Sequence, residues 1–238
     1  KKNGVDRLSI GIQSFNTDIL NTLGIKRDRN KTFEMLDYIK QIGFYNVNLD
    51  LIYAIPNQTL EILNEDIDIF LSLNPNHISC YSLMIEPHTK LYINKIKPID
   101  EELDYEMYKL IEDRLSSYGY KHYEISNYSK PNYESKHNLV YWDNLEYYGF
   151  GLSASSYIDG IRTDNTKSLN KYIDNKFIDN YIDVSNDDMK YGLMLGFRKL
   201  EGINIEEFNK RYNTNILILL KKFIDDNKVV VKDNYVKI

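Results

Sequence analysis

The chain has 238 residues, of which 42% are hydrophobic and 27% charged, and its formal net charge is −5. A membrane-spanning helix needs about 20 consecutive apolar residues and none occur, and the acidic balance leads us to expect no nucleic-acid partner. The single cysteine, Cys80, excludes an internal disulfide framework and suits a reducing cytoplasm.

The first part of the chain alternates between two kinds of pattern. A period of two predicts strands over 7–15, 46–53 and 77–84, and apolar stripes at helical spacing predict helices over 31–43 and 59–73. Strand–helix–strand–helix–strand is typical of parallel βαβ units, so the predicted fold class is α/β.

One face of the predicted strands is polar, carrying Gln13, Asn48, Asp50, Ser79 and Tyr81. A parallel strand that is covered on both faces usually consists of apolar residues throughout. These side chains could therefore line a barrel interior that faces a polar ligand. A sheet with one solvated face would give the same pattern, and the pattern alone leaves both interpretations open.

The character of the chain changes after Pro98. A helix is predicted over 100–119, and the segment 120–165 is aromatic and loop-rich. From about residue 168 the chain is predicted to be helical in pieces, over 187–200, 204–212 and 216–227, before a terminal hairpin, "KVVVKDNYVKI". Helices followed by a two-stranded wing are typical of a small winged-helix-like domain.

The segment "HNLVYW" runs from His137 to Trp142 and holds the only tryptophan of the chain. An imidazole is a good ligand for iron, zinc or copper, and the neighbouring rings could stack on a flat macrocycle. A packed structural histidine is the alternative. Cys80 alone cannot hold an iron–sulfur cluster, which usually takes three or four thiolates, and we predict that it packs in the core.

Six segments occur in one order along the first 165 residues: "GVDRLSIGIQSFN", "NVNLDLIYAIPNQTLE", "HISCYSLMIEPHTKLY", "HYEISNYS", "HNLVYW" and "YYGFGLSASSYIDGIRTDN". Together they resemble the HemN/HemW group of radical SAM proteins. "HNLVYW" is similar to the HNxxYW element of the haem-chaperone (HemW) branch of that group.

The resemblance implies the C-terminal part of a partial (β/α)6 radical SAM barrel, followed by a small helical, winged-helix-like domain. It divides the chain into barrel units over 1–98, a family-specific extension over 99–167 and a C-terminal domain over 168–238. It also implies haem as a ligand, with S-adenosylmethionine and a [4Fe–4S] cluster in the full-length family member.

The resemblance also assigns residues by their place in the motifs. It implies haem binding with His137 as the iron contact, helped by Asn138, Tyr141 and Trp142. The positions that match family contacts to S-adenosylmethionine are Gln13, Asp50, Met84 and Ser155.

The chain departs from the family pattern at several positions. The CxxxCxxC cluster motif is absent, and because it precedes the matched region, the Lys start predicts a truncation and a chain that binds no cluster. Ile25 stands where the family usually has Arg, and Ala54 and His88 stand where it usually has Gly.

Three functions follow as expectations. The first is a haem chaperone that delivers haem to respiratory haem proteins. The second is an enzyme, an oxygen-independent coproporphyrinogen III oxidase that decarboxylates its substrate by radical chemistry. The third is an inactive, truncated barrel. Whether the chain is an enzyme stays open, as do a homodimer and a peripheral association with the membrane in place of a purely cytoplasmic location.

Overall fold

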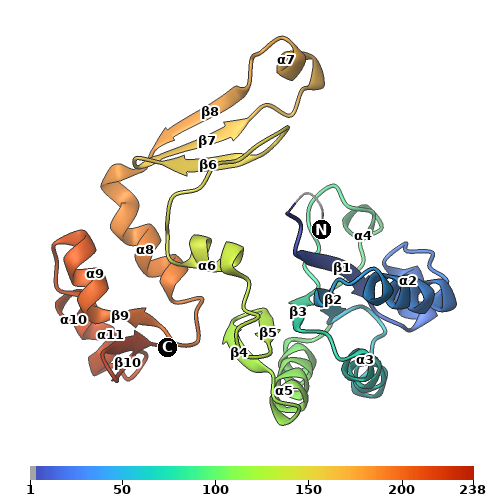
Figure 1. The fold of residues 1–238 in the computed structure, drawn as a ribbon. Coiled ribbons are helices and arrows are strands. Elements are labelled where there is room, and N and C mark those ends of the chain that lie inside the picture. Colours follow the sequence, from blue (N-terminus) through green and yellow to red (C-terminus); the bar gives the residue numbers. More distant parts are fainter. Residues whose placement is uncertain (1–3) are drawn as a thin grey trace. The chain divides into compact units, whose positions relative to one another are not determined.

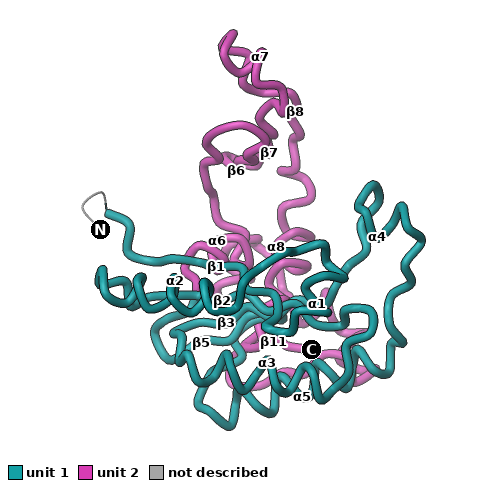
Figure 2. The backbone as a smooth tube through the Cα atoms, turned by 90° about the vertical axis from the view of Figure 1, so that its right-hand side faces the viewer, with its two compact units in different colours: residues 1–134 teal, residues 135–238 magenta. Residues whose placement is uncertain are grey.

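A computed structural model of the chain describes residues 4–238. These residues form two compact units, the first ending at Glu134 and the second beginning at Ser135 (Figure 2). The predicted three-part division at residues 98 and 167 stays a prediction. Among the described residues, no helix is long and apolar enough to cross a membrane.

The first unit is built on a five-stranded sheet in the order β1-β2-β3-β5-β4. Its strands are β1 (Arg7–Gln13), β2 (Asn46–Tyr53), β3 (His77–Ser82), β4 (Lys121–Glu124) and β5 (Asn127–Ser129). β1, β2 and β3 are parallel, as the βαβ pattern predicts, whereas β5 and β4 pair antiparallel. The sheet thus holds consecutive units of a barrel and ends in an added hairpin.

Helices connect the strands of this sheet (Figure 1). They are α1 (Thr17–Thr22), α2 (Arg29–Gln41), α3 (Leu60–Leu73), α4 (Lys90–Ile93) and α5 (Glu101–Ser117). Asp28, Thr59 and Asp100 cap the three longest, since each side chain accepts a backbone N–H of the first turn. The Asp28 cap explains why α2 begins two residues before the predicted start.

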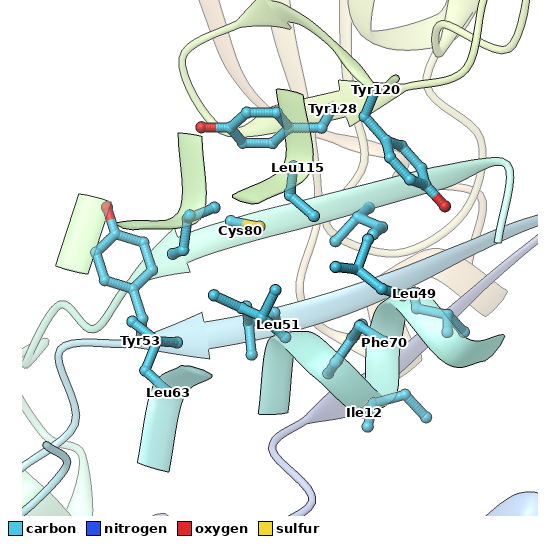
Figure 3. Close-up of a cluster of buried hydrophobic side chains, with 14 of the residues drawn as sticks. Ile12, Leu49, Leu51, Tyr53, Leu63, Phe70, Cys80, Leu115, Tyr120 and Tyr128 are labelled. Carbon is cyan, nitrogen blue, oxygen red and sulfur yellow. The ribbon is translucent and has the colours of Figure 1, made fainter. Parts of the chain in front are cut away.

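The apolar face of the sheet packs against α2, α3 and α5 (Figure 3). Strand residues such as Ile12, Leu51 and Cys80 meet Phe70 of α3 and Met107 of α5 in one buried cluster. Cys80 is 5% exposed, so its predicted packing role is confirmed. The opposite face of the same sheet is polar, and it carries the first candidate site.

The second unit joins a three-stranded sheet to a helical domain (Figure 1). Its first elements are α6 (Lys136–Trp142), β6 (Ser155–Ile158), β7 (Ile161–Asn165), α7 (Leu169–Ile173), β8 (Ile178–Asp183) and a 3-10 turn (Ser185–Asp187). β6, β7 and β8 form an antiparallel sheet in chain order. The prediction of helix from residue 168 onward is wrong at β8, whose residues are all exposed and give no inward-facing apolar signal.

The remainder of the second unit has a winged-helix-like order. It comprises α8 (Asp188–Gly196), β9 (Ile203–Asn204), α9 (Ile205–Tyr212), α10 (Ile216–Leu219), α11 (Lys221–Asp225), β10 (Val230–Lys232) and β11 (Tyr235–Lys237). β11 lies between β10 and β9 in an antiparallel sheet, which is the predicted wing with one added strand. A small core around Phe208, Ile216 and Val236 joins the helices to this sheet.

Candidate functional site

The polar sheet face of the first unit brings side chains from adjacent strands into rows. Gly11 of β1 pairs with Asp50 of β2, and Asp50 pairs with Ser79 of β3. One step earlier, Asn48 pairs with Ser9 and with His77. Since side chains alternate between the faces of a strand, both rows point to the same side of the sheet.

Asn48 is the centre of a buried hydrogen-bond network on this face. Its Nδ2 donates to Ser9 Oγ at 2.6 Å and to Asp50 Oδ1 at 2.7 Å. Its Oδ1 accepts from His77 Nδ1 at 2.6 Å and from Ser79 Oγ at 3.1 Å. An amide has two donors and one oxygen with two lone pairs, so every hydrogen-bonding position of Asn48 is used and the Asp50 carboxylate is held in place.

His77 extends this network to Tyr123. Because Asn48 Oδ1 only accepts, His77 Nδ1 carries the proton, and Nε2 accepts from the Tyr123 hydroxyl at 2.8 Å. Burial, together with the Arg7 guanidinium, lowers the pKa of His77 to about 3. The imidazole is therefore neutral at physiological pH and serves to orient Asn48.

Gln13 ends β1 beside Asp50. A Cβ on Gly11 would lie 2.6 Å from Gln13 Nε2 and 3.9 Å from Asp50 Oδ2, so both side chains border the space above this glycine. Gln13 has a φ of 72°, and its Oε1 is buried without a hydrogen-bond partner among the described residues. A buried acceptor without a donor fits a site that receives a polar ligand.

The other two residues assigned to S-adenosylmethionine are not part of this cluster. Met84 follows β3 and is 75% exposed. Ser155 begins β6 in the second unit, where its Oγ donates to Asp164 Oδ1 at 2.5 Å. The structure thus brings Gln13 and Asp50 together, and describes Ser155 only within its own unit.

The second candidate site is α6, the helix formed by "HNLVYW". At about 100° per residue, His137 and Tyr141 share one stripe of the helix, and Asn138 and Trp142 share the neighbouring stripe. Ser135 caps the helix by accepting the Asn138 backbone N–H at 3.4 Å. The four residues therefore present two adjacent chemical surfaces.

His137 is exposed and pairs with Tyr141. The Tyr141 hydroxyl lies 2.8 Å from His137 Nε2, and the two rings meet edge to face at 4.8 Å. Tyr147 packs against the other side of Tyr141, with ring centroids 4.6 Å apart. This stack fixes the imidazole on the surface, where a ligand can reach it.

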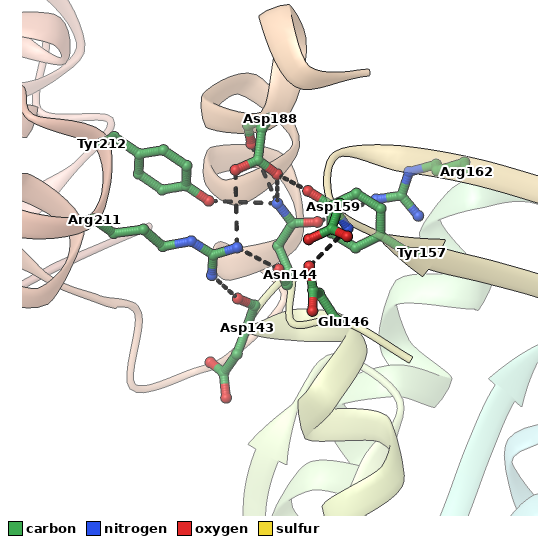
Figure 4. Close-up of polar contacts among 9 residues, drawn as sticks. All are labelled: Asp143, Asn144, Glu146, Tyr157, Asp159, Arg162, Asp188, Arg211 and Tyr212. Atoms are coloured by element: carbon green, nitrogen blue, oxygen red, sulfur yellow. Dashed lines mark hydrogen bonds and ion pairs between the residues drawn. The ribbon is translucent and has the colours of Figure 1, made fainter. Parts of the chain in front are cut away.

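The end of α6 is anchored by Asn144, which is 1% exposed (Figure 4). Its Nδ2 donates to Asp188 Oδ1 at 2.6 Å, and its Oδ1 accepts from Arg162 Nη2 at 3.1 Å. Arg211 Nη1 donates to the carbonyl of Asp143 at 2.7 Å. These contacts join α6 to α8, α9 and β7 within the second unit.

Sequence reasoning missed three of these residues. The sequence pattern marks Asn48 only as one of several polar positions, and it does not single out His77, Tyr123 or Asn144. His77 and Tyr123 lie on strands that meet only through the pairing with β5, so no spacing in the sequence relates them. Among the described residues, no group of three or more His, Cys, Asp or Glu side chains could hold a metal ion.

The fold matches that of a solved radical SAM enzyme. The structure of coproporphyrinogen III oxidase (HemN) from Escherichia coli superposes with a TM-score of 0.81 over 100% of this chain and 61% of that chain. The sequence identity is 20%, so this match concerns the fold. The chain therefore has a mixed α/β fold of the radical SAM class and contains part of the barrel, as predicted.

Curated relatives of the chain carry the name of a haem chaperone. The "Heme chaperone HemW" of Lactococcus lactis is 36% identical over 217 residues, which are 87% of this chain and 57% of that protein. The protein of the same name from Bacillus subtilis is 35% identical over 236 residues, 95% of this chain and 62% of that protein. The chain thus spans about 60% of the length of these relatives.

No family model matches the chain. The relatives nevertheless confirm the resemblance to the HemN/HemW group of radical SAM proteins on its haem-chaperone side.

Proposed function

We propose that the chain is the haem-binding part of a haem chaperone and that His137 is the iron contact. The observation that carries the proposal is the exposed imidazole of α6, supported by Tyr141 and Tyr147 in a protein whose relatives are named haem chaperones. Respiratory haem proteins as acceptors, a homodimer and a cytoplasmic location stay predictions.

The side chains of α6 have distinct tasks in this proposal. Iron takes a nitrogen lone pair of neutral imidazole, and Nε2 is engaged by the Tyr141 hydroxyl. Ligation through Nε2 therefore requires the imidazole to rotate away from that hydroxyl, while the Tyr141 ring stays packed against Tyr147. Asn138 and Trp142 contact the ligand from the neighbouring stripe.

The polar face of the first unit fits S-adenosylmethionine as a ligand. Gln13 offers a buried acceptor, and Asp50 offers a carboxylate held by Asn48. A carboxylate can accept hydrogen bonds from ribose hydroxyls, so we assign Asp50 and Gln13 as binding residues. The assignments of Met84 and Ser155 stay predictions. A [4Fe–4S] cluster would supply reducing electrons to radical chemistry, but Cys80, the sole cysteine, is buried in the apolar core.

A hemin titration followed in the Soret region tests the proposal. We expect a saturable spectrum for this chain that is lost in His137→Ala. The matched control is His88→Ala, since His88 is also exposed but lies in the first unit. A spectrum that survives His137→Ala, or that is equally lost in His88→Ala, contradicts the assignment.

A further inference from the structure

A cavity of about 280 Å³ lies in the first unit, beside the C-terminal ends of α2 and α3 and the start of β2. Its walls are mainly apolar and include Leu36, Ile39, Phe44, Val47 and Leu73. Leu49, which also lines it, belongs to the buried apolar cluster of the sheet (Figure 3). The cavity therefore lies on the helix-covered side of the sheet, away from the polar face that carries Asp50.

The charged residues that line this cavity are both lysines. Lys40 lies in the last turn of α2, Lys130 directly follows β5, and no carboxylate is among the lining residues. Neither lysine forms an ion pair in the part of the chain that the structure describes. A cavity lined by charges of one sign attracts the opposite charge, so this one favours an anion although the chain as a whole has a net charge of −5.

The ammonium group of Lys130 is oriented by hydrogen bonds to Asn74. Its Nζ donates to Asn74 Oδ1 at 2.6 Å and to the Asn74 carbonyl at 3.2 Å. An ammonium group has three donors, so one is left for a ligand. Lys130 is half-buried, and burial lowers its pKa because the charged form loses solvent without gaining a carboxylate. A carboxylate of a ligand would compensate for that loss.

The wall of the cavity between α3 and β3 is held in place by contacts within the first unit. The Tyr120 hydroxyl donates to the Pro75 carbonyl at 2.6 Å, and the Tyr120 ring centroid lies 5.8 Å from Lys130 Nζ. The Asn76 N–H donates to the Val47 carbonyl at 3.2 Å, and the Lys130 N–H donates to the Asn76 carbonyl at 2.9 Å. A preorganised site of this kind loses less conformational entropy when a ligand binds.

Two helices end at this cavity, and the C-terminus of a helix by itself disfavours an anion. At the end of α2, the N–H groups of Gly43 and Phe44 pair with carbonyls of the last helical turn. At the end of α3, the Asn74 carbonyl accepts from the Lys130 ammonium. The partial negative charges of both helix ends are thus offset, and the two lysines determine the charge of the lining.

We propose that this cavity binds a small carboxylate with an apolar chain, such as a medium-chain fatty acid. Lys130 binds the carboxylate, Lys40 adds a second positive charge, and the chain packs against the apolar walls. The cavity lies at the lower end of the size range of small-molecule pockets, so a short flexible chain suits it better than a large ring system. The site goes beyond the proposed function and does not depend on it, since none of its residues belongs to α6.

Isothermal titration calorimetry of the full chain with octanoate tests the proposal. We expect one saturable site, and we expect Lys130→Gln to raise the Kd about five- to tenfold because it removes a charge-assisted hydrogen bond. The matched control is Lys31→Gln, at an exposed residue of α2 about 13 Å from Lys40 along the helix axis. Solvent screens charges at that distance, so the control should change the Kd by less than about twofold.

Two further measurements separate the carboxylate from the chain. 1-Octanol has the same chain but no charge, so the difference between the wild type and Lys130→Gln should disappear with this ligand. Ile39→Phe fills part of the cavity and should weaken the binding of octanoate and 1-octanol alike, by about tenfold or more. Far-UV circular dichroism confirms that each variant is folded.

The outcomes decide each part of the proposal. Equal octanoate affinity in the wild type and Lys130→Gln would overturn the assignment of the carboxylate site. Unchanged binding in Ile39→Phe would show that the chain lies outside this cavity, and a wild type that binds no octanoate overturns the proposal as a whole. The hemin titration of His137→Ala is a separate measurement, so failure of one proposal leaves the other standing.

Discussion

The buried imidazole of His77 makes the stability of the first unit depend on pH. His77 is fully buried and donates to Asn48, and burial lowers its pKa from the ordinary 6.5 to about 3. In the unfolded chain the same imidazole takes up a proton near pH 6.5. Between these two pKa values the unfolded state therefore binds one proton more than the native state.

The sign and the magnitude follow from this difference. When the unfolded state binds more protons, the free energy of unfolding rises with pH. The stability that the neutral His77 contributes is therefore lost as the pH falls below 6.5. The slope approaches about 1.4 kcal/mol per pH unit, which amounts to about 2 kcal/mol between pH 7 and pH 5. The first unit should thus be less stable at pH 5 than at pH 7.

Urea unfolding at pH 7, 6 and 5, followed by far-UV circular dichroism, measures this slope. The control is His77→Gln, which keeps a polar side chain but has no group that titrates in this range. We expect the variant to be less stable than the wild type at pH 7 and to lose less stability on acidification. Equal slopes for the two proteins would refute the reasoning that His77 is held neutral by the fold.

Three further predictions concern single positions. Asp66 accepts hydrogen bonds from Ser14 Oγ at 2.5 Å and from the Phe15 N–H at 2.7 Å. Asp66→Ala leaves both donors buried without an acceptor, so it should lower the free energy of unfolding in urea by about 2–3 kcal/mol. A loss under about 1 kcal/mol would contradict this reasoning. Burial raises the pKa of the Cys80 thiol, so a thiol reagent should label the native chain far more slowly than the urea-unfolded chain, and equal rates would exclude a packed Cys80. A Cβ on Gly192 would lie 2.3 Å from Tyr212 Oη. Gly192→Ala should therefore lower the free energy of unfolding by about 1–3 kcal/mol. An unchanged unfolding midpoint would show that the tyrosine can move.

The elements that the sequence predicted well have a one-sided apolar pattern. β1, β2 and β3 each place alternate residues in the core, and α3 buries Leu63, Ile67 and Phe70 on one stripe. The prediction is wrong at β8 because its six residues are all exposed, so no alternation of buried and exposed residues indicates a strand. The strands β4 and β5 are short, and the pairing of β5 with β3 depends on tertiary contacts that no local window of the sequence contains.

Part of the candidate site was predictable for the same reason. Gln13 and Asp50 stood out because polar residues are unusual on a parallel strand, and the register indeed places them around Gly11. The network behind Asp50 was not predictable, since Tyr123 reaches His77 across 46 positions of the chain. The hydrogen bond between Tyr123 and His77 forms only because the hairpin of β4 and β5 pairs with β3.

The order of residues in "HNLVYW" determines which side of α6 each side chain occupies. Spacings of four and five residues on a helix place one aromatic ring beside the imidazole and turn the other away from it. Tyr141 accordingly lies with its hydroxyl 2.8 Å from His137 Nε2. Trp142 instead lies about 140° further round the helix, where it lines a pocket together with residues of α8 and α9. The order of the six residues therefore gives α6 a surface imidazole on one side and an indole directed toward α8 and α9 on another.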